Sequence, residues 1–345
     1  MRRFDLLCGA HRVLITGGTG SLGRALVNRL LKDGAERVVV FSRDEAKQAR
    51  MAEEIGEHPA IRFMLGDVRD RDRLEQAMWG VEAVVNAAAL KRVDSVSFHP
   101  TEVEKTNVTG TRNVIEAAMH AGVKKVLVIS SDKAVAPENL YGASKKMAEA
   151  LAVAANRYAW PRGTRVGCVR YGNVLGSRGS AAHVFRRQAL LGQPLTVTDP
   201  TMTRFIITMP QAVDFCLAAL RDLQGGEIFV PILPAARVWD LALAAAEAWN
   251  GLTTSPAVVI GRRAGGEKLH EVLLSEDEIR RALEQMTPMG GRFVVPPAAP
   301  SWDAQAAWMG ERLPLDFSYS SDLPPRILTV GDLVPLLREM PEEMI

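Results

Sequence analysis

The sequence predicts an α/β protein with a Rossmann-like, doubly wound parallel sheet and a smaller C-terminal lobe. Two features of the first half predict the sheet. Short β-branched runs alternate with amphipathic helical stretches, and a glycine-rich stretch, TGGTGSLG, follows the first run. In the second half this alternation breaks down, and prolines punctuate the chain at Pro194, Pro200, Pro210, Pro231 and Pro234.

The elements of the first half are expected in a fixed order. The predicted strands are RVLITGG, RVVVFSR, IRFMLGD, AVVNAAA, KVLVISS and RVGCVRYGNVLG. The predicted helices run from about residue 21 to 32, from 44, from 70, from about 107 to 121 and from about 139 to 157. Strands that alternate with helices are joined by right-handed crossovers, so we expect a parallel sheet.

The change of pattern also predicts a division into domains. Residues 1–175 are expected to form the Rossmann domain, completed by about residues 205–235, which carry the helix MPQAVDFCLAALRDL and the strand GEIFVPI. Residues 176–204 and 236–345 are expected to form the second lobe, with the helices VWDLALAAAEAW and SEDEIRRALEQ.

Composition and charge exclude several classes of protein. Hydrophobic residues make up 47% of the 345 residues and charged residues 24%, as in soluble globular proteins. The formal net charge is +2 without a basic block, so no nucleic acid partner is expected. No apolar run approaches the roughly 18 residues that a membrane span needs, and the short run near the start contains Asp5, unlike a signal peptide.

Cysteine and histidine give no sign of a metal centre. Cys8, Cys168 and Cys216 form no CxxC pair, and the histidines show no HExxH spacing. We therefore expect neither a disulfide framework nor a metal site, and the three thiols fit a reducing cytoplasm.

The glycine-rich stretch predicts a dinucleotide site. Gly17, Gly20 and Gly23 follow the first strand and open the first helix, with Ser21 and Leu22 between them. Glycine allows the tight turn, the close approach of backbone to a pyrophosphate and the close packing of helix on strand. The N-terminus of the helix then faces the negative charge.

The end of the second strand favours NADP over NAD. An NAD enzyme usually carries an acid here for the ribose hydroxyls, but this chain has Ser42 and Arg43. Asp44, the next residue, leaves NAD as the alternative, because its carboxylate could point back toward a ribose.

Two further strand ends are expected to contact the coenzyme. Asp67 and Val68 are placed to flank the adenine, although Asp67 could instead be a helix cap or turn residue. The small residues Ala87, Ala88 and Ala89 follow the fourth strand, where bulk would collide with a bound coenzyme. Close helix packing is the alternative reason for these alanines.

Tyr141 and Lys145 provide the parts for oxidising a sugar hydroxyl. They lie four residues apart in a predicted helix and so share one face. A neighbouring ammonium and an oxidised nicotinamide both lower the tyrosine pKa from its usual value of about 10. Tyr141 can then take a proton from the hydroxyl as hydride leaves the carbon, with Ser131 bonded to the same oxygen. The alternative is an ordinary helix surface.

Asp132 and Lys133 follow a strand and are expected at the ligand-binding edge of the sheet. A 4-epimerase would leave this pair without a role. Once C4 of a hexose is a ketone, loss of water needs a base for the C5 proton and an acid for the O6 hydroxyl. Lys133 is a base only when neutral, so its pKa must be lowered by burial or nearby positive charge. A local salt bridge or loop cap is the alternative.

The chain resembles the extended short-chain dehydrogenases/reductases, and within them the inverting UDP-N-acetylglucosamine 4,6-dehydratases of capsular-polysaccharide and pseudaminic-acid pathways. The likeness runs through TGGTGSLG, FSRDEAKQARM, AAALKRVD, KTNVTGTRNVIEAA, SSDKAVAPENLYGASK, VRYGNVLGSRGS, TMTRFIIT, GGEIFVPI, GEKLHE and FSYSSD. It implies that Lys133 removes the C5 proton and Asp132 handles the O6 proton, or the reverse, with C5 reprotonated from the opposite face. The retaining dehydratases have Asp-Glu at this pair.

The resemblance also implies the remaining site residues. It adds Asn107, Tyr141 and Lys145 to the coenzyme contacts and assigns one Arg of GRRAGGEKLHE to the diphosphate. Arg262 and Arg263 compete for that role, because the family has one residue fewer here. Ser131 replaces a more usual Thr, and Asn86 stands where the family often has His. The implied substrate contacts are Lys91, Asn173, Arg178, Gly179, Ser180, Thr203, Arg204, Arg262, Arg263 and Glu267.

Together these features predict a cytoplasmic, NADP-dependent hydro-lyase. The expected reaction converts UDP-N-acetylglucosamine to UDP-2-acetamido-2,6-dideoxy-4-keto-hexose with inversion at C5. The alternatives are a UDP-hexose 4-epimerase, a dehydratase that stops at a 5,6-ene, and an NADP-binding redox sensor without catalysis. The resemblance implies a homo-oligomer, from dimer to hexamer.

Overall fold

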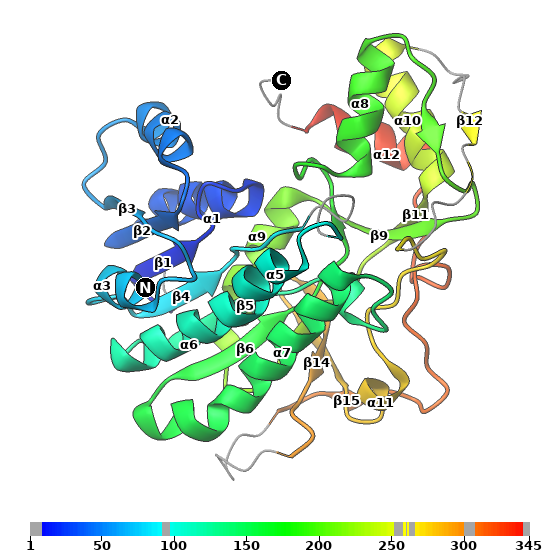
Figure 1. Ribbon diagram of the computed structural model, residues 1–345. Coiled ribbons are helices and arrows are strands. Elements are labelled where there is room, and N and C mark those ends of the chain that lie inside the picture. The colour runs from blue at the N-terminus through cyan, green and yellow to red at the C-terminus, as the bar shows by residue number, and fades with distance from the viewer. Residues whose placement is uncertain are drawn as a thin grey trace.

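A ten-stranded β-sheet forms the centre of the computed structural model (Figure 1), which describes residues 9–91, 97–251, 258–259, 261, 266–299 and 308–340. Across the sheet the strands are β3 (Ile61–Leu65), β2 (Arg37–Ser42), β1 (Arg12–Thr16), β4 (Ala83–Asn86), β5 (Lys125–Ile129), β6 (Arg165–Val169), β10 (Ile228–Pro231), β14 (Gly290–Val295), β13 (Leu283–Thr287) and β15 (Glu311–Arg312). The pairs from β3 to β10 are parallel, and the remaining pairs are antiparallel. The predicted Rossmann-like order is confirmed, so ligands are expected beyond the carboxyl ends of the parallel strands.

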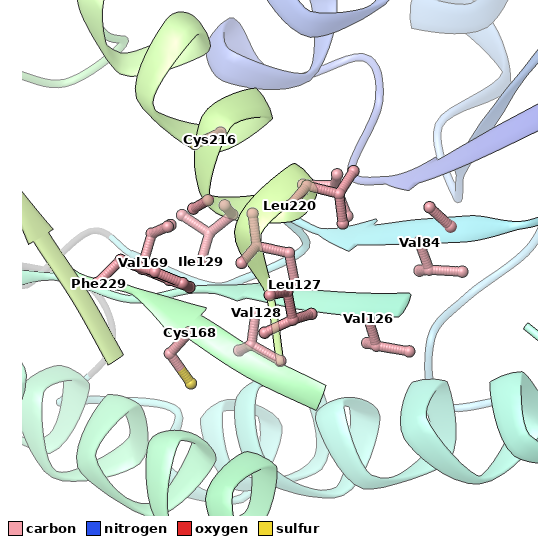
Figure 2. Packing of buried hydrophobic residues seen from close by; sticks show 14 of the residues in the cluster. Val84, Val126, Leu127, Val128, Ile129, Cys168, Val169, Cys216, Leu220 and Phe229 are labelled. Carbon is pink, nitrogen blue, oxygen red and sulfur yellow. The ribbon is translucent and has the colours of Figure 1, made fainter. Parts of the chain in front are cut away.

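Helices cover both faces of the sheet, which explains the nearly continuous apolar strands. α1 (Ser21–Lys32) and α9 (Met209–Asp222) pack together on one face, and α6 (Gly110–His120) and α7 (Leu140–Ala159) on the other (Figure 1). Figure 2 shows Cys216 and Leu220 of α9 above Leu127 of β5. The short α5 (Pro100–Val103) runs through a π-helical segment, Glu104–Thr109, into α6.

Three predicted helix starts are confirmed, because a side chain at each accepts a hydrogen bond from the first turn. Asp44 caps α2 (Glu45–Ile55), Asp70 caps α3 (Arg71–Ala77) and Asn139 caps α7. The last cap fixes where α7 begins and therefore where Tyr141 and Lys145 lie.

One predicted helix is largely wrong. SEDEIRRALEQ forms only the short α11 (Glu276–Ile279), started by a capping box between Ser275 and Glu278. From Leu283 the chain becomes β13 and pairs with β14. Strand pairing at the sheet edge therefore overrides the helical pattern. It also places β13, β14 and β15 in the large sheet, although residues 236–345 were expected in the second lobe.

A second hydrophobic cluster organises the smaller lobe. It packs α8 (Ala181–Leu190), α10 (Val238–Asn250) and α12 (Val330–Arg338) around Phe185, Leu241 and Leu333. A three-stranded sheet of β7 (Asn173–Val174), β9 (Thr203–Ile207) and β11 (Ala235–Arg237) leads into this lobe, and β8 (Thr196–Val197) pairs with β12 (Val258–Val259). In Figure 1 the lobe stands above the carboxyl-end side of the parallel strands.

Cys168 and Cys216 are buried free thiols, and Cys8 lies outside the described residues. Within the described ranges, none of the helices is long and apolar enough to cross a membrane. Nor does this part of the chain hold a group of three or more His, Cys, Asp or Glu side chains arranged for a metal ion.

A buried ion triad joins β6, α7 and α11. The guanidinium of Arg170, fully buried just after β6, donates two hydrogen bonds to Glu149 and two to Glu278, at 2.7–2.8 Å. Arg170 also donates to the Leu273 carbonyl at 2.8 Å. Although burial disfavours the charged forms, this pairing raises the pKa of Arg170 and lowers that of Glu278, so Arg170 and Glu278 both stay charged.

Replacing Arg170 with Ala is expected to lower the free energy of unfolding by about 3–5 kcal/mol, because two buried carboxylates lose their cation. Urea denaturation measures this change. Arg165→Ala is the matched control. It lies on the exposed start of β6, where its guanidinium stacks on Trp160, and its loss is expected to cost about 0.5–1 kcal/mol. Equal destabilisation by both variants would contradict the role of the triad.

Candidate active site

A cavity of about 1080 Å³ lies at the carboxyl ends of the parallel strands. Its lining comes from the turns after β1, β2, β3, β4 and β5 and from α8, β9 and the segment that includes Gly266 and Glu271. The cavity therefore joins the sheet edge to the smaller lobe, as ligand sites of this fold do.

At one end of the cavity, the glycine turn leaves no room for side chains at Gly17 and Gly23. Gly17 has φ +62°, and a Cβ there would lie 2.9 Å from backbone atoms of Ala87 and Ala88. A Cβ at Gly23 would lie 2.5 Å from the Gly17 carbonyl oxygen. The alanines therefore pack on the glycine turn and also line the cavity.

The N-terminus of α1 is open to a ligand. Gly20 is the N-cap and provides no side-chain cap, and Gly20, Ser21 and Leu22 all line the cavity. First-turn N–H groups without an intrahelical partner suit a pyrophosphate. The residues of this turn therefore fit a dinucleotide coenzyme.

The segment from the end of β2 to the first turn of α2 brings charged residues to the cavity. Its lining residues are Ser42, Arg43, Asp44 and Lys47. The Asp44 carboxylate accepts from the Lys47 backbone N–H at 3.0 Å and lies 2.7 Å from its Nζ. These bonds lower the pKa of Asp44 and use its carboxylate as a helix cap.

The end of β3 shows that Asp67 acts as a turn residue. Its carboxylate accepts from the backbone N–H of Arg69 at 3.0 Å and pairs with the Arg69 guanidinium at 2.7 Å and, more distantly, with Arg43 at 3.8 Å. Asp67 and Val68 also line the cavity.

A single turn of 3-10 helix, Asp132–Ala134, carries the predicted catalytic pair beyond β5. Asp132 is fully buried, and its Oδ1 accepts from the Ser131 hydroxyl at 2.7 Å and from Lys133 Nζ at 3.1 Å. Its other oxygen, Oδ2, is buried without a hydrogen-bond partner. Such an unmet acceptor is costly inside a protein.

The structure corrects the expected charge of Lys133. Burial lowers its pKa, but the carboxylates of Asp132 and Glu271 outweigh burial and raise the pKa well above the ordinary value. Lys133 Nζ lies 3.2 Å from Glu271 Oε1. Lys133 is therefore an ammonium in this structure, not the neutral amine that a base requires.

Tyr141 and Lys145 lie in the first turns of α7, both buried and both lining the cavity. Burial raises the pKa of Tyr141 to about 12; the Lys133 charge opposes this rise and Asp132 adds to it. Burial lowers the pKa of Lys145 to about 8, and its Nζ donates to the Ile129 carbonyl at 2.8 Å. The cation found to act on Tyr141 is thus Lys133, whereas the sequence analysis considered only Lys145.

Most predicted substrate contacts reach the cavity. The lining includes Lys91, Asn173, Arg178, Gly179, Ser180, Arg204 and Glu267. The backbone N–H of Arg178 donates to the Ser21 hydroxyl at 3.2 Å, so this residue lies beside the glycine turn. Arg262 and Arg263 lie outside the described residues.

Two predicted contacts are structural instead and do not line the cavity. The buried Asn107 amide accepts from the Leu90 N–H at 2.8 Å and donates to the Ser144 hydroxyl at 2.9 Å, fastening the loop after β4 to α7. The Thr203 hydroxyl bonds to His270 at 2.8 Å and to Ser321 at 2.7 Å. Both side chains are therefore occupied within the protein.

The structure also gives Asn86 a role. Its Oδ1 accepts from the Thr16 hydroxyl at 2.6 Å, and its Nδ2 donates to the Thr111 hydroxyl at 3.1 Å. Asn86 thereby links the ends of β1 and β4 to α6, beneath the glycine turn.

Sequence reasoning missed Glu271. This side chain is only 2% exposed, lines the cavity and pairs with Lys133. GEKLHE contains two glutamates, and the sequence analysis chose Glu267. No local spacing distinguishes Glu271, because its partner Lys133 is far away in the chain.

Comparisons with known proteins agree with this geometry. A UDP-N-acetylglucosamine 4,6-dehydratase (inverting) from Campylobacter jejuni is 39% identical over 334 residues, which cover 94% of this chain and 96% of the relative. A UDP-glucose 4-epimerase from Rickettsia rickettsii is 42% identical over 289 residues, or 81% of this chain and 83% of the relative. The relatives therefore include both reactions that the sequence analysis weighed.

Solved structures share the fold. Pen from Bacillus thuringiensis superimposes with a TM-score of 0.85 at 34% identity, covering 95% of this chain and 98% of that one. DesIV, a dTDP-glucose 4,6-dehydratase from Streptomyces venezuelae with NAD bound, has a TM-score of 0.64 at 25% identity over 73% of this chain and 85% of that one.

The model of a family described as polysaccharide biosynthesis protein matches residues 13–290. Together with relatives of about 40% identity along most of its length, this match confirms the resemblance inferred from the motifs. The chain belongs to the polysaccharide biosynthesis protein family.

Proposed function

We propose that the protein is a nucleotide-sugar 4,6-dehydratase that converts UDP-N-acetylglucosamine to the 6-deoxy-4-keto sugar with inversion at C5. The observation that carries this proposal is the Asp132–Lys133 pair, which lines the same cavity as Tyr141 and keeps one carboxylate oxygen without a donor. An epimerase needs only the oxidising residues. The Campylobacter jejuni relative is named an inverting dehydratase, and the alignment with this chain covers 96% of its length; this relative supports the same choice.

We propose NADP as the coenzyme. When bound, its nicotinamide would take hydride from C4 of the sugar and return it at C6. Arg43, just after β2, and Lys47, in the first turn of α2, line the cavity and bring the positive charge that a 2′-phosphate requires, while the Asp44 carboxylate caps α2 and pairs with Lys47. NAD, present in DesIV, is the alternative.

Tyr141 and Ser131 act on the sugar hydroxyl at C4. Tyr141 accepts the hydroxyl proton. Burial raises the pKa of Tyr141, and the Lys133 ammonium opposes this rise; the Lys145 ammonium and an oxidised nicotinamide would favour the anion further. The Ser131 hydroxyl, which donates to Asp132, would bond to the same sugar oxygen.

Asp132 and Lys133 supply the acid and the base for loss of water. A proton shift across the 3.1 Å between them turns the ion pair into a carboxylic acid and a neutral amine. The amine takes the C5 proton and the acid protonates O6, so the C6–O6 bond breaks, water leaves and the ion pair is restored. Without the shift, the carboxylate serves as base and the ammonium as acid. Either way the pair acts with no net uptake of protons.

We further propose that the smaller lobe binds the nucleotide sugar and that the protein works in the cytoplasm as a homo-oligomer. Arg178 and Arg204 line the cavity next to the smaller lobe. Both suit a diphosphate, because the guanidinium makes paired bonds to phosphate oxygens. Two buried free thiols fit a reducing compartment. The exposed Met286 and Met309 at the sheet edge fit a contact between subunits.

Proton NMR in heavy water tests the proposed reaction. Incubation with UDP-N-acetylglucosamine and NADP⁺ is expected to give a new C6 methyl signal and deuterium at C5, because the C5 proton is exchanged. Lys133→Met is expected to slow this conversion by about 10²–10⁴-fold, with NADPH binding unchanged. Lys124→Met, exposed near the far end of β5, is the control. Inversion at C4 with the C5 proton intact would support an epimerase instead.

Arg43→Ala is expected to raise the Kd for NADPH by about 10- to 100-fold, the loss of one charge-assisted bond to phosphate. The Kd for NADH should change little, since NADH lacks the 2′-phosphate. Isothermal titration calorimetry measures both values. Arg62→Ala, on the exposed side of β3 and outside the cavity lining, is the control. An equal rise in the Kd values for NADPH and NADH would exclude Arg43 as the phosphate contact.

The pH dependence of kcat/KM is expected to differ between the wild type and the Lys145→Arg variant. With a pKa of about 8, Lys145 loses its charge as pH rises through that value, whereas arginine keeps it. The charge favours the Tyr141 anion. The ratio of kcat/KM for Lys145→Arg to that of the wild type is therefore expected to be constant in acid and to rise above pH 8. A ratio independent of pH would show that the charge of Lys145 plays no part.

A further inference from the structure

Glu271 brings a second carboxylate to Lys133 from a distant part of the chain. Its Oε1 lies 3.2 Å from Lys133 Nζ, opposite Asp132 Oδ1 at 3.1 Å. We propose that Glu271 is a positioning residue for the dehydration step, whose carboxylate holds the Lys133 ammonium against Asp132. This role rests on the proposed dehydratase function.

Burial makes this contact strong. Asp132 is fully buried and Glu271 is 2% exposed, whereas the Lys133 side chain keeps 25% of its surface. Two buried carboxylates beside one ammonium are screened little by water, so the ammonium is strongly attracted to the position between them. The flexible lysine side chain therefore has one favoured place, at the cavity wall.

The Glu271 backbone is fixed in turn. Its N–H donates to the Ser321 hydroxyl at 2.8 Å, and its carbonyl accepts from the Ser321 N–H at 2.8 Å. Val272 and Ser320 form the adjoining antiparallel bridge. A carboxylate on such a support can hold a partner within the small tolerance that proton transfer needs.

One carboxylate oxygen of Glu271 makes no hydrogen bond within the described part of the protein. Its Oε2 is buried without a hydrogen-bond partner, and the Nζ of Lys268 lies 4.0 Å away. An acid that served only to join the two parts of the chain would be expected to use both oxygens, because an unmet buried acceptor is destabilising. Glu271 and Asp132 line the same cavity.

Glu271 also sets how firmly Lys133 keeps its proton. Removing this negative charge should lower the pKa of Lys133, because burial and the charge of Arg204 already favour the neutral amine. In the part of the chain that the structure describes, the charged or titratable groups that face Lys133 or Glu271 are Asp132, Tyr141, Arg204 and Lys268.

The test compares Glu271→Gln, Glu271→Asp and the control Glu276→Gln, an exposed carboxylate on α11. In protein labelled with ¹³C-lysine, Lys133 is assigned by its absence from Lys133→Met, and its titration is followed by NMR. Glu271→Gln is expected to move this titration to lower pH and to reduce kcat by about 10- to 100-fold with KM nearly unchanged. If the titration of Lys133 determines part of the dependence of kcat on pH, that part should also shift to lower pH.

Glu271→Asp, which keeps the charge, should recover part of the activity, and Glu276→Gln should match the wild type. An unchanged Lys133 titration in a folded Glu271→Gln protein would overturn the inference, as would a normal kcat. The titration needs no substrate. If the wild type failed to dehydrate UDP-N-acetylglucosamine, the proposed function would fail while the Lys133 contact could still be measured.

Discussion

The site depends on one electrostatic contact, the Lys133 ammonium held between the buried carboxylates of Asp132 and Glu271. Asp132 comes from the turn after β5, and Glu271 from the segment that follows the smaller lobe's α10. The contact gives the cavity an acid and a base next to Tyr141. It also explains why an Asp-Lys pair is present where sugar oxidation alone would need neither residue.

The fold supplies the rigidity that this contact requires. The parallel strands bring Ser131 and Asp132 to the ligand-binding edge, and the Asn139 cap places Tyr141 and Lys145 beside them. Arg170 joins α7, through Glu149, to α11, through Glu278. The helix that carries Tyr141 and Lys145 is thus fastened near the segment that carries Glu271, so the buried triad and the cavity share one framework.

The sequence predicted what local patterns encode. The glycine turn, the strand ends and the YxxxK helix follow from spacing along short segments, and the structure places these residues around one cavity. The strand β13 was missed because its pairing with β14 decides its conformation. Glu271, the engaged side chain of Thr203 and the raised pKa of Lys133 were missed because each depends on contacts between residues distant in sequence.

A crystal structure of the Tyr141→Phe variant with NADP⁺ and UDP-N-acetylglucosamine tests the central claim most directly, since this variant should bind the sugar without oxidising it. The account predicts that the Asp132 carboxylate and Lys133 Nζ lie within about 3–3.5 Å of O6 and of C5 or its proton. A sugar whose C5 and C6 face away from both side chains, with the ion pair closed off from the ligand, would contradict it.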